Sequence, residues 1–374
     1  MSNPKRLVLI LGDQLDSLSA VLKGFDLQHD EVIMIESIPE AQVVWSHKAK
    51  IALFLSAMRH FAQKLENDGF PVHYIRDSKL SIVDSLKEVL LQKSVKHLVC
   101  VEPGEWRLKL ALEKLAKDAK VQLDMREDSH FYCSHREFRE WAANKKELRL
   151  EFFYRLMRKT HNILLDKDGN PEGGQWNFDQ DNRKPYPKSG PGIIEAPVLF
   201  EPDAMTQEVL AFVQENYPEH PGSLEHFRWP VTRDQALEAL QYFVDYRLRN
   251  FGIYQDAMWT DTPYGWHSIL SSSLNLKLLN PREVITAVVG AWKKYSLDLS
   301  TVEGFIRQIL GWREFVRGMY YLDMPKMSTD NYYKHQRALP SWYWTGQTKM
   351  RCMKDAVGQT LQYGYAHHIQ RLMV

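Results

Sequence analysis

Short apolar runs rich in β-branched residues alternate with helical patterns over the first 130 residues, and this alternation restricts the fold more than any other feature. Between the runs, one helical pattern begins at a possible N-cap, Ser46, and stops at Gly69. Strands that alternate with helices form parallel sheets through right-handed crossovers. We therefore expect an α/β domain with a doubly wound parallel sheet over residues 1–135. The expected strands are 6–11, 31–36, 71–76, 97–102 and 121–126, and the other helices are near 81–93 and 105–119.

Polar residues follow the first two expected strands. Asp13 and Gln14 come after the first strand, and Glu36 ends the second. Ligands of such sheets bind at the carboxyl ends of the strands. The alternative for Asp13 is a turn residue or a helix cap. The chain has neither G-x-G-x-x-G nor G-x-x-x-x-G-K, so the sequence supports neither a dinucleotide fingerprint nor a P-loop.

The chain changes character after residue 135. We expect a helical stretch over 136–165, followed by a run dense in Gly, Pro, Asn and Asp over 167–192. Such a run predicts a long loop. Trp176 and Phe178 within it indicate an ordered loop that packs on another part of the protein. We place an interdomain linker over 136–204.

Residues 205–374 predict an all-α domain, because capping signals recur and no strand pattern intervenes. The three capping signals are Thr232 with Gln235, Asn280 with Pro281 and Glu283, and Ser300 with Glu303. They open helices near 233–249, 281–295 and 301–321. No apolar stretch of 18 residues occurs, so we expect no membrane span. Three cysteines cannot form a disulfide framework and indicate a reducing cytoplasm.

Two segments of the helical region carry side chains suited to an anionic, flat ligand. Four serines lie within residues 268–273, and hydroxyls at a helix start can donate to phosphate oxygens. In the helix after Phe305, Gln308 and Trp312 are four apart and share a face. Arg313 and Arg317 share a neighbouring face. The alternatives are an ordinary Ser-rich cap and a buried amphipathic helix with paired arginines.

The C-terminal region is basic and aromatic. Residues 307–374 hold 10 basic and 4 acidic residues, a net charge of +6. This suits a polyanion-binding surface, although an ordinary solvated face is an equal alternative. His367 and His368 are adjacent, and on a helix adjacent residues diverge by about 100°, which is poor geometry for a shared metal. Either one could act as a general acid, or both could be ordinary histidines.

These segments together resemble the photolyases and cryptochromes. That family carries a TSxLSPYLxxGxLSPR pattern around its flavin diphosphate, and residues 267–282 are a variant of it. Its WREF pattern is similar to residues 312–315. His267 stands where the family has Thr, Ser273 replaces Tyr, and Lys277 replaces Gly. These departures are similar to those of the prokaryotic iron–sulfur branch, which contains (6-4) photolyases and bacterial cryptochromes. Four further motifs also resemble that branch: LGDQL near the start of the chain, GGQWNFDQDNRK, DAMW and YAHHIQRLM.

The resemblance implies light-driven repair of a pyrimidine (6-4) pyrimidone in UV-damaged DNA by reduced FAD. It assigns His367, His368 and Gln308 to the lesion site and Trp344 to electron transfer. A 6,7-dimethyl-8-ribityllumazine antenna would contact Asp13, Gln14, Glu36 and Lys48. The residues implied for FAD are Tyr254, His267, Ser268, Leu270, Ser271, Trp312 and Arg313.

The resemblance also implies a 4Fe–4S cluster, which needs four thiolates. Cys352 matches one cluster ligand, and the others are expected beyond Val374, so we expect the helical domain to be incomplete and the cluster to form only in a longer chain. The alternatives to repair are a blue-light sensor without repair activity and an inactive fragment. We expect a monomer in the cytoplasm.

Overall fold

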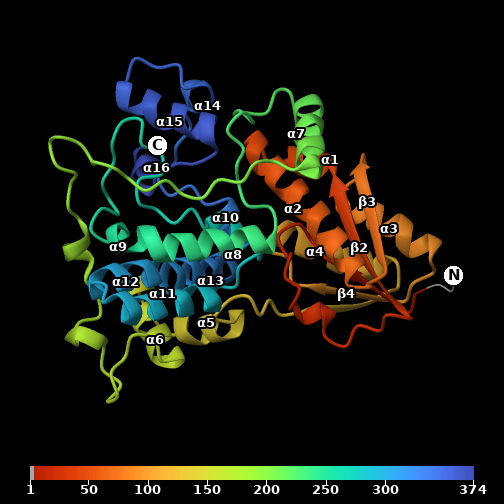
Figure 1. Cartoon of the computed structure of the whole chain (residues 1–374). Helices are drawn as coiled ribbons and strands as arrows, with labels where there is room; N and C mark the ends of the chain where they lie inside the picture. The colour runs from red at the N-terminus through yellow and green to blue at the C-terminus, as the bar shows by residue number, and fades with distance from the viewer. Residues whose placement is uncertain (1–3) are drawn as a thin grey trace.

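A five-stranded parallel sheet forms the N-terminal part of the protein. The computed structural model describes residues 4–374, and the sheet lies on the right in Figure 1. Its strand order is β3-β2-β1-β4-β5, and every neighbouring pair is parallel. The predicted doubly wound sheet is therefore confirmed. The strands are β1 (Arg6–Leu9), β2 (Asp30–Ser37), β3 (Val72–Ser78), β4 (His97–Val101) and β5 (Gln122–Arg126).

The two faces of the sheet bury different residues of the same strand. Val8 of β1 packs in the cluster that contains α2 (Lys48–Asn67). Leu7 and Leu9 pack with α3 (Ile82–Gln92) and α4 (Trp106–Asp118) on the other face. This alternation follows from the two-residue period of a strand. The α2 cluster continues into the helical part of the chain, so the sheet and the helices share one core.

Helix α2 begins one residue later than predicted. Its N-cap is His47 rather than Ser46, and the Nδ1 atom of His47 accepts a hydrogen bond from the backbone N–H of Ala49 at 2.9 Å. An imidazole nitrogen thus performs the capping role that the sequence pattern assigned to a serine hydroxyl. The short helix α1 (Ile38–Val43) precedes it.

The predicted helical stretch over 136–165 is interrupted, because two helices occupy it. Helix α5 (His135–Ala142) ends at Ala143, and Asn144 has a positive φ of 61° that no continuing helix allows. Helix α6 (Leu150–His161) then begins after Arg149. The loop that follows is ordered, as Trp176 and Phe178 predicted. The Arg158 guanidinium lies 5.0 Å from the Trp176 ring, and the Phe178 N–H donates to Glu303.

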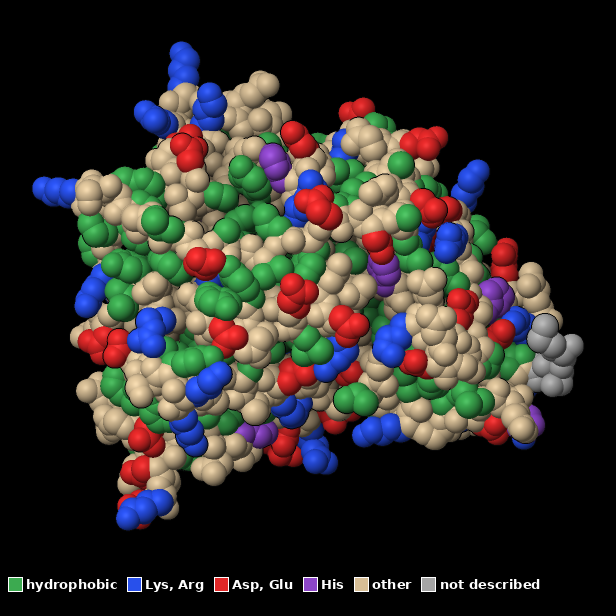
Figure 2. All heavy atoms as spheres, viewed as in Figure 1, with side chains coloured by type: hydrophobic (Ala, Val, Ile, Leu, Met, Phe, Trp, Pro, Cys, Tyr) green, Lys and Arg blue, Asp and Glu red, His purple; other side chains and the backbone are tan. Residues whose placement is uncertain are grey.

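Acidic and basic side chains are interspersed on the face of the molecule seen in Figure 2.

Helices make up nearly all the regular structure after residue 204 (Figure 1). No helix among residues 4–374 is long and apolar enough to cross a membrane. The helices are α7 (Ala204–Asn216), α8 (Arg233–Tyr242), α9 (Leu248–Phe251), α10 (Ser271–Leu276), α11 (Pro281–Tyr295), α12 (Leu299–Ile306), α13 (Glu314–Asp323), α14 (Trp342–Thr345), α15 (Arg351–Tyr363) and α16 (His368–Met373).

Two of the predicted helices contain π-helical turns, Phe243–Arg247 after α8 and Arg307–Arg313 after α12. The Ser300 capping signal is wrong. Helix α12 begins at Leu299 after Asp298, and the Glu303 carboxylate accepts from the loop at Phe178 instead of closing a capping box. The other two capping boxes form as predicted.

The carboxyl edge of the sheet packs on the helical region. Lys277, just after α10, pairs with Asp128 after β5 at 2.9 Å. His130 Nε2 lies 2.7 Å from the Leu279 carbonyl oxygen, and the Tyr320 hydroxyl of α13 accepts from the N–H of Trp106 at 2.8 Å. These contacts fix α10 and α13 relative to the strand ends.

Candidate functional site

A cavity of about 590 Å³ lies between α2, α10 and the C-terminal helices. Its volume falls in the range of cofactor pockets. The charged side chains of its lining are Lys50 and Arg371, which favour an anionic ligand. Other lining residues include His47, Phe54, Trp229, Ser271, Ser272, Asn275, Thr360, Leu361 and Tyr365.

The serine cluster meets this cavity at the start of α10. Ser271 and Ser272 both line it. Within residues 4–374, the hydroxyl oxygens of Ser272 and Ser273 are buried without a hydrogen-bond partner. An unsatisfied buried hydroxyl costs about 1–3 kcal/mol. A ligand with phosphate oxygens in the cavity would remove that cost at Ser272.

The turn before α10 is strained. Ile269 has a φ of 59°, a conformation that a β-branched residue rarely adopts. On either side, Ser268 Oγ accepts from the Leu270 N–H at 3.4 Å, and the Leu270 side chain is buried. Such strain persists only where surrounding contacts enforce it and is frequent at ligand sites.

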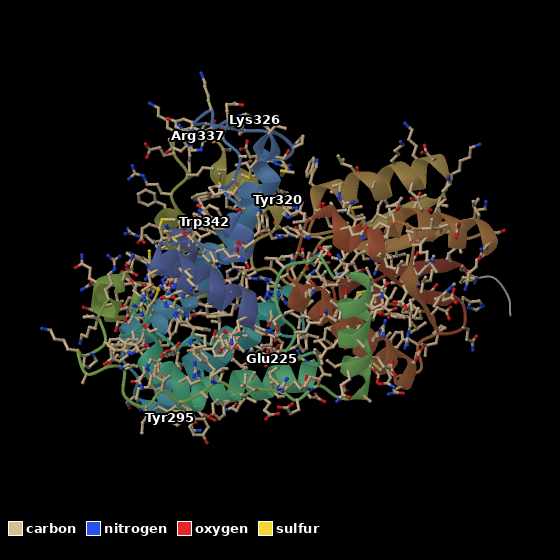
Figure 3. The ribbon with its side chains drawn as sticks, turned by 90° about the horizontal axis from the view of Figure 1, so that it is seen from above. Glu225, Tyr295, Tyr320, Lys326, Arg337 and Trp342 are labelled. Carbon is tan, nitrogen blue, oxygen red and sulfur yellow. The ribbon has the colours of Figure 1, made fainter. Side chains whose placement is uncertain are left out.

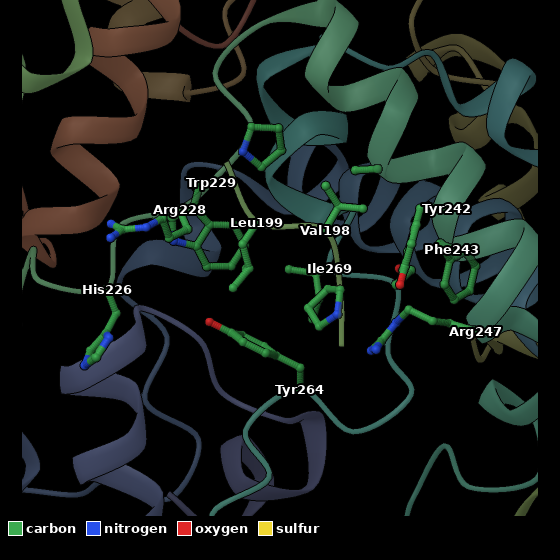
Figure 4. Close-up of a pocket in the computed structure, with 14 residues that line it drawn as sticks. Val198, Leu199, His226, Arg228, Trp229, Tyr242, Phe243, Arg247, Tyr264 and Ile269 are labelled. Atoms are coloured by element: carbon green, nitrogen blue, oxygen red, sulfur yellow. The ribbon is translucent and has the colours of Figure 1, made fainter. Parts of the chain in front are cut away.

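Buried Arg247 enforces the path of this turn. It donates from Nη2 to the carbonyl oxygens of Gly265 at 2.7 Å and His267 at 2.8 Å. Burial lowers the pKa of Arg247 to about 10. Figure 4 shows Arg247 near Ile269 and Tyr264 around a second, smaller pocket, which Ser268 also lines. The sequence analysis missed Arg247, which sits in the π-helical turn after α8.

Three histidines meet beside the cavity. His267 Nε2 lies 2.9 Å from His367 Nε2, and the rings of His367 and His368 stack at 4.5 Å. The sequence analysis placed the adjacent pair on one helix and is wrong there, because His367 is the extended N-cap of α16 and only His368 is helical. The geometric objection to a shared ligand therefore does not hold. His368 Nε2 is 2.9 Å from Asp256 Oδ1.

Two of these imidazoles are neutral at physiological pH. Burial, followed by repulsion from His367 and His368, lowers the pKa of His267 to about 3. Burial and the neighbouring His368 lower the pKa of His367 to about 4. Both rings therefore keep a lone pair at pH 7.

Other predicted site residues lie outside the cavity lining. The Tyr254 ring stacks on Tyr186 at 4.9 Å, and the exposed Gln308 donates to the Gly304 carbonyl. Trp312 is half exposed. The Arg313 guanidinium stacks 3.9 Å from the Phe131 ring, and burial lowers the pKa of Arg313 to about 10.

The predicted antenna residues lie near the strand ends and have protein contacts. Gln14 donates to the carbonyls of Val101 and Glu102, and Glu36 forms a buried pair with Arg59 at 2.7 Å. Burial raises the pKa of Asp13. Lys48 is buried at the start of α2. The pocket beside Gln14 holds about 10 Å³, room for roughly one water, and Asp13, Glu36 and Lys48 do not line it, so the antenna site stays a prediction.

The cysteines are far apart in the chain and differ in burial. Cys352 is exposed, whereas Cys100 and Cys133 are buried. A four-iron cluster needs four thiolates, so the cysteines within residues 4–374 do not complete one. The Trp344 ring lies 5.0 Å from Trp45, and its role in electron transfer stays a prediction.

The sequence model described as deoxyribodipyrimidine photo-lyase-related protein matches residues 8–229. The chain belongs to this family. It is 43% identical over 374 residues to a (6-4) photolyase of Agrobacterium fabrum, an alignment that covers 99% of this chain and 73% of that protein. It is 36% identical over 113 residues, 30% of the chain, to an uncharacterised mimivirus protein, R853, of which it covers 86%.

Two solved structures that share this fold are a photolyase and a cryptochrome. A class III photolyase from Agrobacterium tumefaciens matches 100% of this chain and 72% of its own, with a TM-score of 0.60 and 14% identity. A Synechocystis cryptochrome matches 99% of this chain and 74% of its own, with a TM-score of 0.62 and 15% identity. At this identity the likeness concerns the fold, and it confirms the prediction of an α/β domain followed by a helical domain.

Proposed function

We propose that this photolyase-related protein binds FAD in the cavity at α10 and uses it for light-driven repair of pyrimidine (6-4) pyrimidone photoproducts in DNA. The observation that carries the proposal is the unpartnered Ser272 hydroxyl at a cavity whose charged side chains are Lys50 and Arg371. The 43% identical relative named a (6-4) photolyase supports the reaction.

The cavity residues fit a flavin diphosphate. Ser271, Ser272 and Asn275 would donate hydrogen bonds to its phosphate oxygens, and Arg371 and Lys50 would balance their charge. FAD, when bound and reduced, supplies the photo-excited electron that reversal of the lesion requires. Leu53 and Phe54 of α2 line the same cavity and would exclude water from the flavin.

The histidine cluster supplies the proton chemistry of this proposal. His368 would carry a proton on Nε2 and donate a hydrogen bond from it to the Asp256 carboxylate, 2.9 Å away. A lesion oxygen in the site would then accept that proton from His368. His367 packs against His368 with ring centroids 4.5 Å apart and, being neutral, places no positive charge beside it. A flipped lesion would reach these rings from the stack of the DNA.

An exposed basic segment supports DNA binding. Residues 326–340 are all exposed and carry Lys326, Lys334 and Arg337 together with Tyr332 and Tyr333. In Figure 3, Lys326 and Arg337 lie at the edge of the helical region opposite Tyr295. Cations and flat rings on one segment suit phosphates and splayed bases.

Flavin binding is tested with the double variant Ser271→Ala, Ser272→Ala. Each hydrogen bond to a charged group contributes about 1.5–3 kcal/mol, so the variant should bind FAD at least tenfold more weakly in equilibrium dialysis. Ser328→Ala is the matched control, because Ser328 is exposed and does not line the cavity. Unchanged FAD affinity in the double variant would refute the assignment.

Repair is tested with His368→Ala in reduced, FAD-loaded protein under illumination. The variant should keep FAD and lesion-DNA binding yet repair (6-4) lesions about 10²–10⁴-fold more slowly. His29→Ala, an exposed position in the sheet domain, should repair at the parent rate. A parent protein that binds flavin but repairs no (6-4) lesion would overturn the repair proposal and favour a light sensor.

A further inference from the structure

Arg247 is a buried cation without a counter-ion. The residue is 1% exposed, and no carboxylate pairs with it in the part of the chain that the structure describes. Its hydrogen bonds go to backbone carbonyl oxygens, from Nη1 to Glu195 and from Nη2 to Gly265 and His267. The Glu195 carboxylate is exposed and accepts instead from the Tyr242 hydroxyl. A buried charge that no opposite charge compensates destabilises the folded chain.

The other buried arginines among the described residues have what Arg247 lacks. Arg59 and Arg307 each pair with a carboxylate. Arg158 donates from all three of its nitrogens to carbonyl oxygens, and its guanidinium lies 5.0 Å from the Trp176 ring. The Nε of Arg247, in contrast, is buried without a hydrogen-bond partner. One donor of a buried, uncompensated cation is therefore left for a ligand.

A small pocket lies at this side chain. Its volume of about 20 Å³ leaves room for a single small ion. The residues described in its lining include Arg247, a second arginine, Arg228, and the hydroxyls of Ser268 and Tyr264, but no carboxylate. Figure 4 shows the Arg247 side chain turned toward the side of Tyr264. Arg228 already pairs with Glu201, so Arg247 carries the charge that remains to be compensated.

We propose that this pocket is a binding site for one small monovalent anion, with chloride as the best match. The Arg247 Nε–H would donate to the ion. The Ser268 hydroxyl, whose oxygen accepts from the Leu270 N–H, keeps a proton to donate as well. A tetrahedral oxyanion such as phosphate needs more room than the pocket offers. Because the guanidinium is buried, its attraction for the ion is stronger than it would be in water.

An ion in the pocket would support the turn that leads to α10. Arg247 holds the carbonyls of Gly265 and His267 in that turn, and Ile269 within it has a strained φ of 59°. Compensation of the charge lowers the cost of keeping the guanidinium between those carbonyls. Anion binding should therefore stabilise the folded protein, since a ligand that binds only the folded state shifts the unfolding equilibrium.

The pocket differs from the cavity proposed for FAD. Arg247 and Ser268 line the pocket, whereas Ser271 and Ser272 line the cavity. Trp229 lines both, so the two adjoin, and a flavin phosphate is the rival occupant. The inference does not rest on flavin binding, because the ion would bind to flavin-free protein in the dark. Its experiment uses halide readouts, with flavin added only as a competitor.

The experiment is halide binding to the flavin-free full chain. Chloride binding is measured from broadening of the chloride NMR line, with bromide as a competitor, and anomalous diffraction from crystals grown in bromide locates the ion. We expect one bromide in the pocket, beside Arg247. Replacing chloride by gluconate at constant ionic strength should lower the Tm of the parent. Arg247→Gln should bind chloride at least about tenfold more weakly and lose this dependence of Tm on chloride.

A second variant and a control accompany Arg247→Gln. If Arg247→Gln does not fold, as judged by circular dichroism, Ala239→Leu fills the pocket from α8 while Arg247 remains, and it should also lose chloride binding. Arg249→Gln is the matched control, because Arg249 is exposed, donates to the Tyr295 carbonyl and does not line the pocket. This variant should bind chloride as the parent does.

The outcomes separate a halide site from a part of the flavin site. Absence of a bromide peak beside Arg247, or equal chloride affinity in the parent and in Ala239→Leu, would overturn the proposal. Displacement of the bromide by FAD would overturn it too, whereas retention of the ion in FAD-loaded protein supports a separate site. A protein that binds chloride here but binds no FAD would refute the flavin proposal and leave this inference intact.

Discussion

Replacing Lys277 with glycine tests how the sheet is tied to the helical region. Lys277 follows α10 with a φ of 66°, a left-handed conformation that favours glycine. Its side chain is 7% exposed, and its Nζ lies 2.9 Å from Asp128 Oδ2. Burial alone would raise the pKa of Asp128, but the charge and hydrogen bond of Lys277 outweigh burial and lower it. Lys277→Gly therefore relieves backbone strain and breaks a buried ion pair.

The ion pair should outweigh the strain. Left-handed backbone costs an L-residue about 1–2 kcal/mol, whereas removal of one partner from a buried pair costs about 3–5 kcal/mol. We expect Lys277→Gly to lower the free energy of unfolding by about 1–4 kcal/mol at pH 7. Adding Asp128→Asn removes the unpaired charge, so the double variant should recover at least about 1 kcal/mol relative to additivity.

Urea unfolding followed by circular dichroism measures these differences. The pKa of Asp128 is lower in the folded protein, so the pair stabilises the protein above the ordinary Asp pKa. This contribution disappears as the pH falls through the lowered folded-state pKa. The difference in unfolding free energy between the parent and Lys277→Gly should therefore become smaller at acid pH. A Lys277→Gly variant as stable as the parent at pH 7, or additive effects in the double variant, would refute the reasoning.

Three further predictions concern packing, thiol reactivity and pH. Gly318→Ala should destabilise the protein by about 1–3 kcal/mol in urea unfolding, because the added Cβ would lie 2.2 Å from the Phe138 ring. A Cβ added at Gly358 would have no atom within 4 Å, so Gly358→Ala should stabilise the protein by up to about 1 kcal/mol. Mass spectrometry after iodoacetamide treatment of native protein should find Cys352 alkylated and the two buried cysteines, whose pKa burial raises to about 12, unmodified. Burial opposes ionisation of Glu102, but its partners His135 and Lys109 lower its pKa to about 2. The ionised Glu102 should therefore stabilise the protein by up to about 3 kcal/mol above pH 4.5, and this stabilisation should be lost as the pH falls toward 2. An equal pH dependence of the unfolding free energy in the parent and in Glu102→Gln would contradict this prediction.

The sheet could be predicted from the sequence because each strand is a short apolar run bounded by polar residues. The helix at Pro281 could also be predicted, since its cap, proline and capping box lie within four residues. Breaks within helices could not. No Gly or Pro marks the break at Asn144, and no local sequence pattern marks the π-helical turns at Phe243–Arg247 and Arg307–Arg313.

The candidate site was predicted only where its residues are close in sequence. The serines of 268–273 are one such group, and Ser271 does line the cavity. Lys50 and Arg371 are more than 300 residues apart, and nothing in either local pattern marks them as neighbours. Asp256 had a signal, because it belongs to the DAMW motif quoted for the resemblance, but its contact with His368 spans 112 residues. Such contacts require the folded chain.

Two departures from the general photolyase pattern acquire a common explanation from these long-range contacts. His267 stands where that pattern has Thr, and its Nε2 meets His367. Lys277 stands where the pattern has Gly, and its Nζ meets Asp128. Each unusual side chain thus has a buried partner on a distant segment. Restoring the common residue at either position alone would leave a buried charged or polar group without its partner, which should lower the free energy of unfolding by about 1–5 kcal/mol. The substitutions are therefore coupled to their partners, and an exchange between branches of the family must change both members of each pair together.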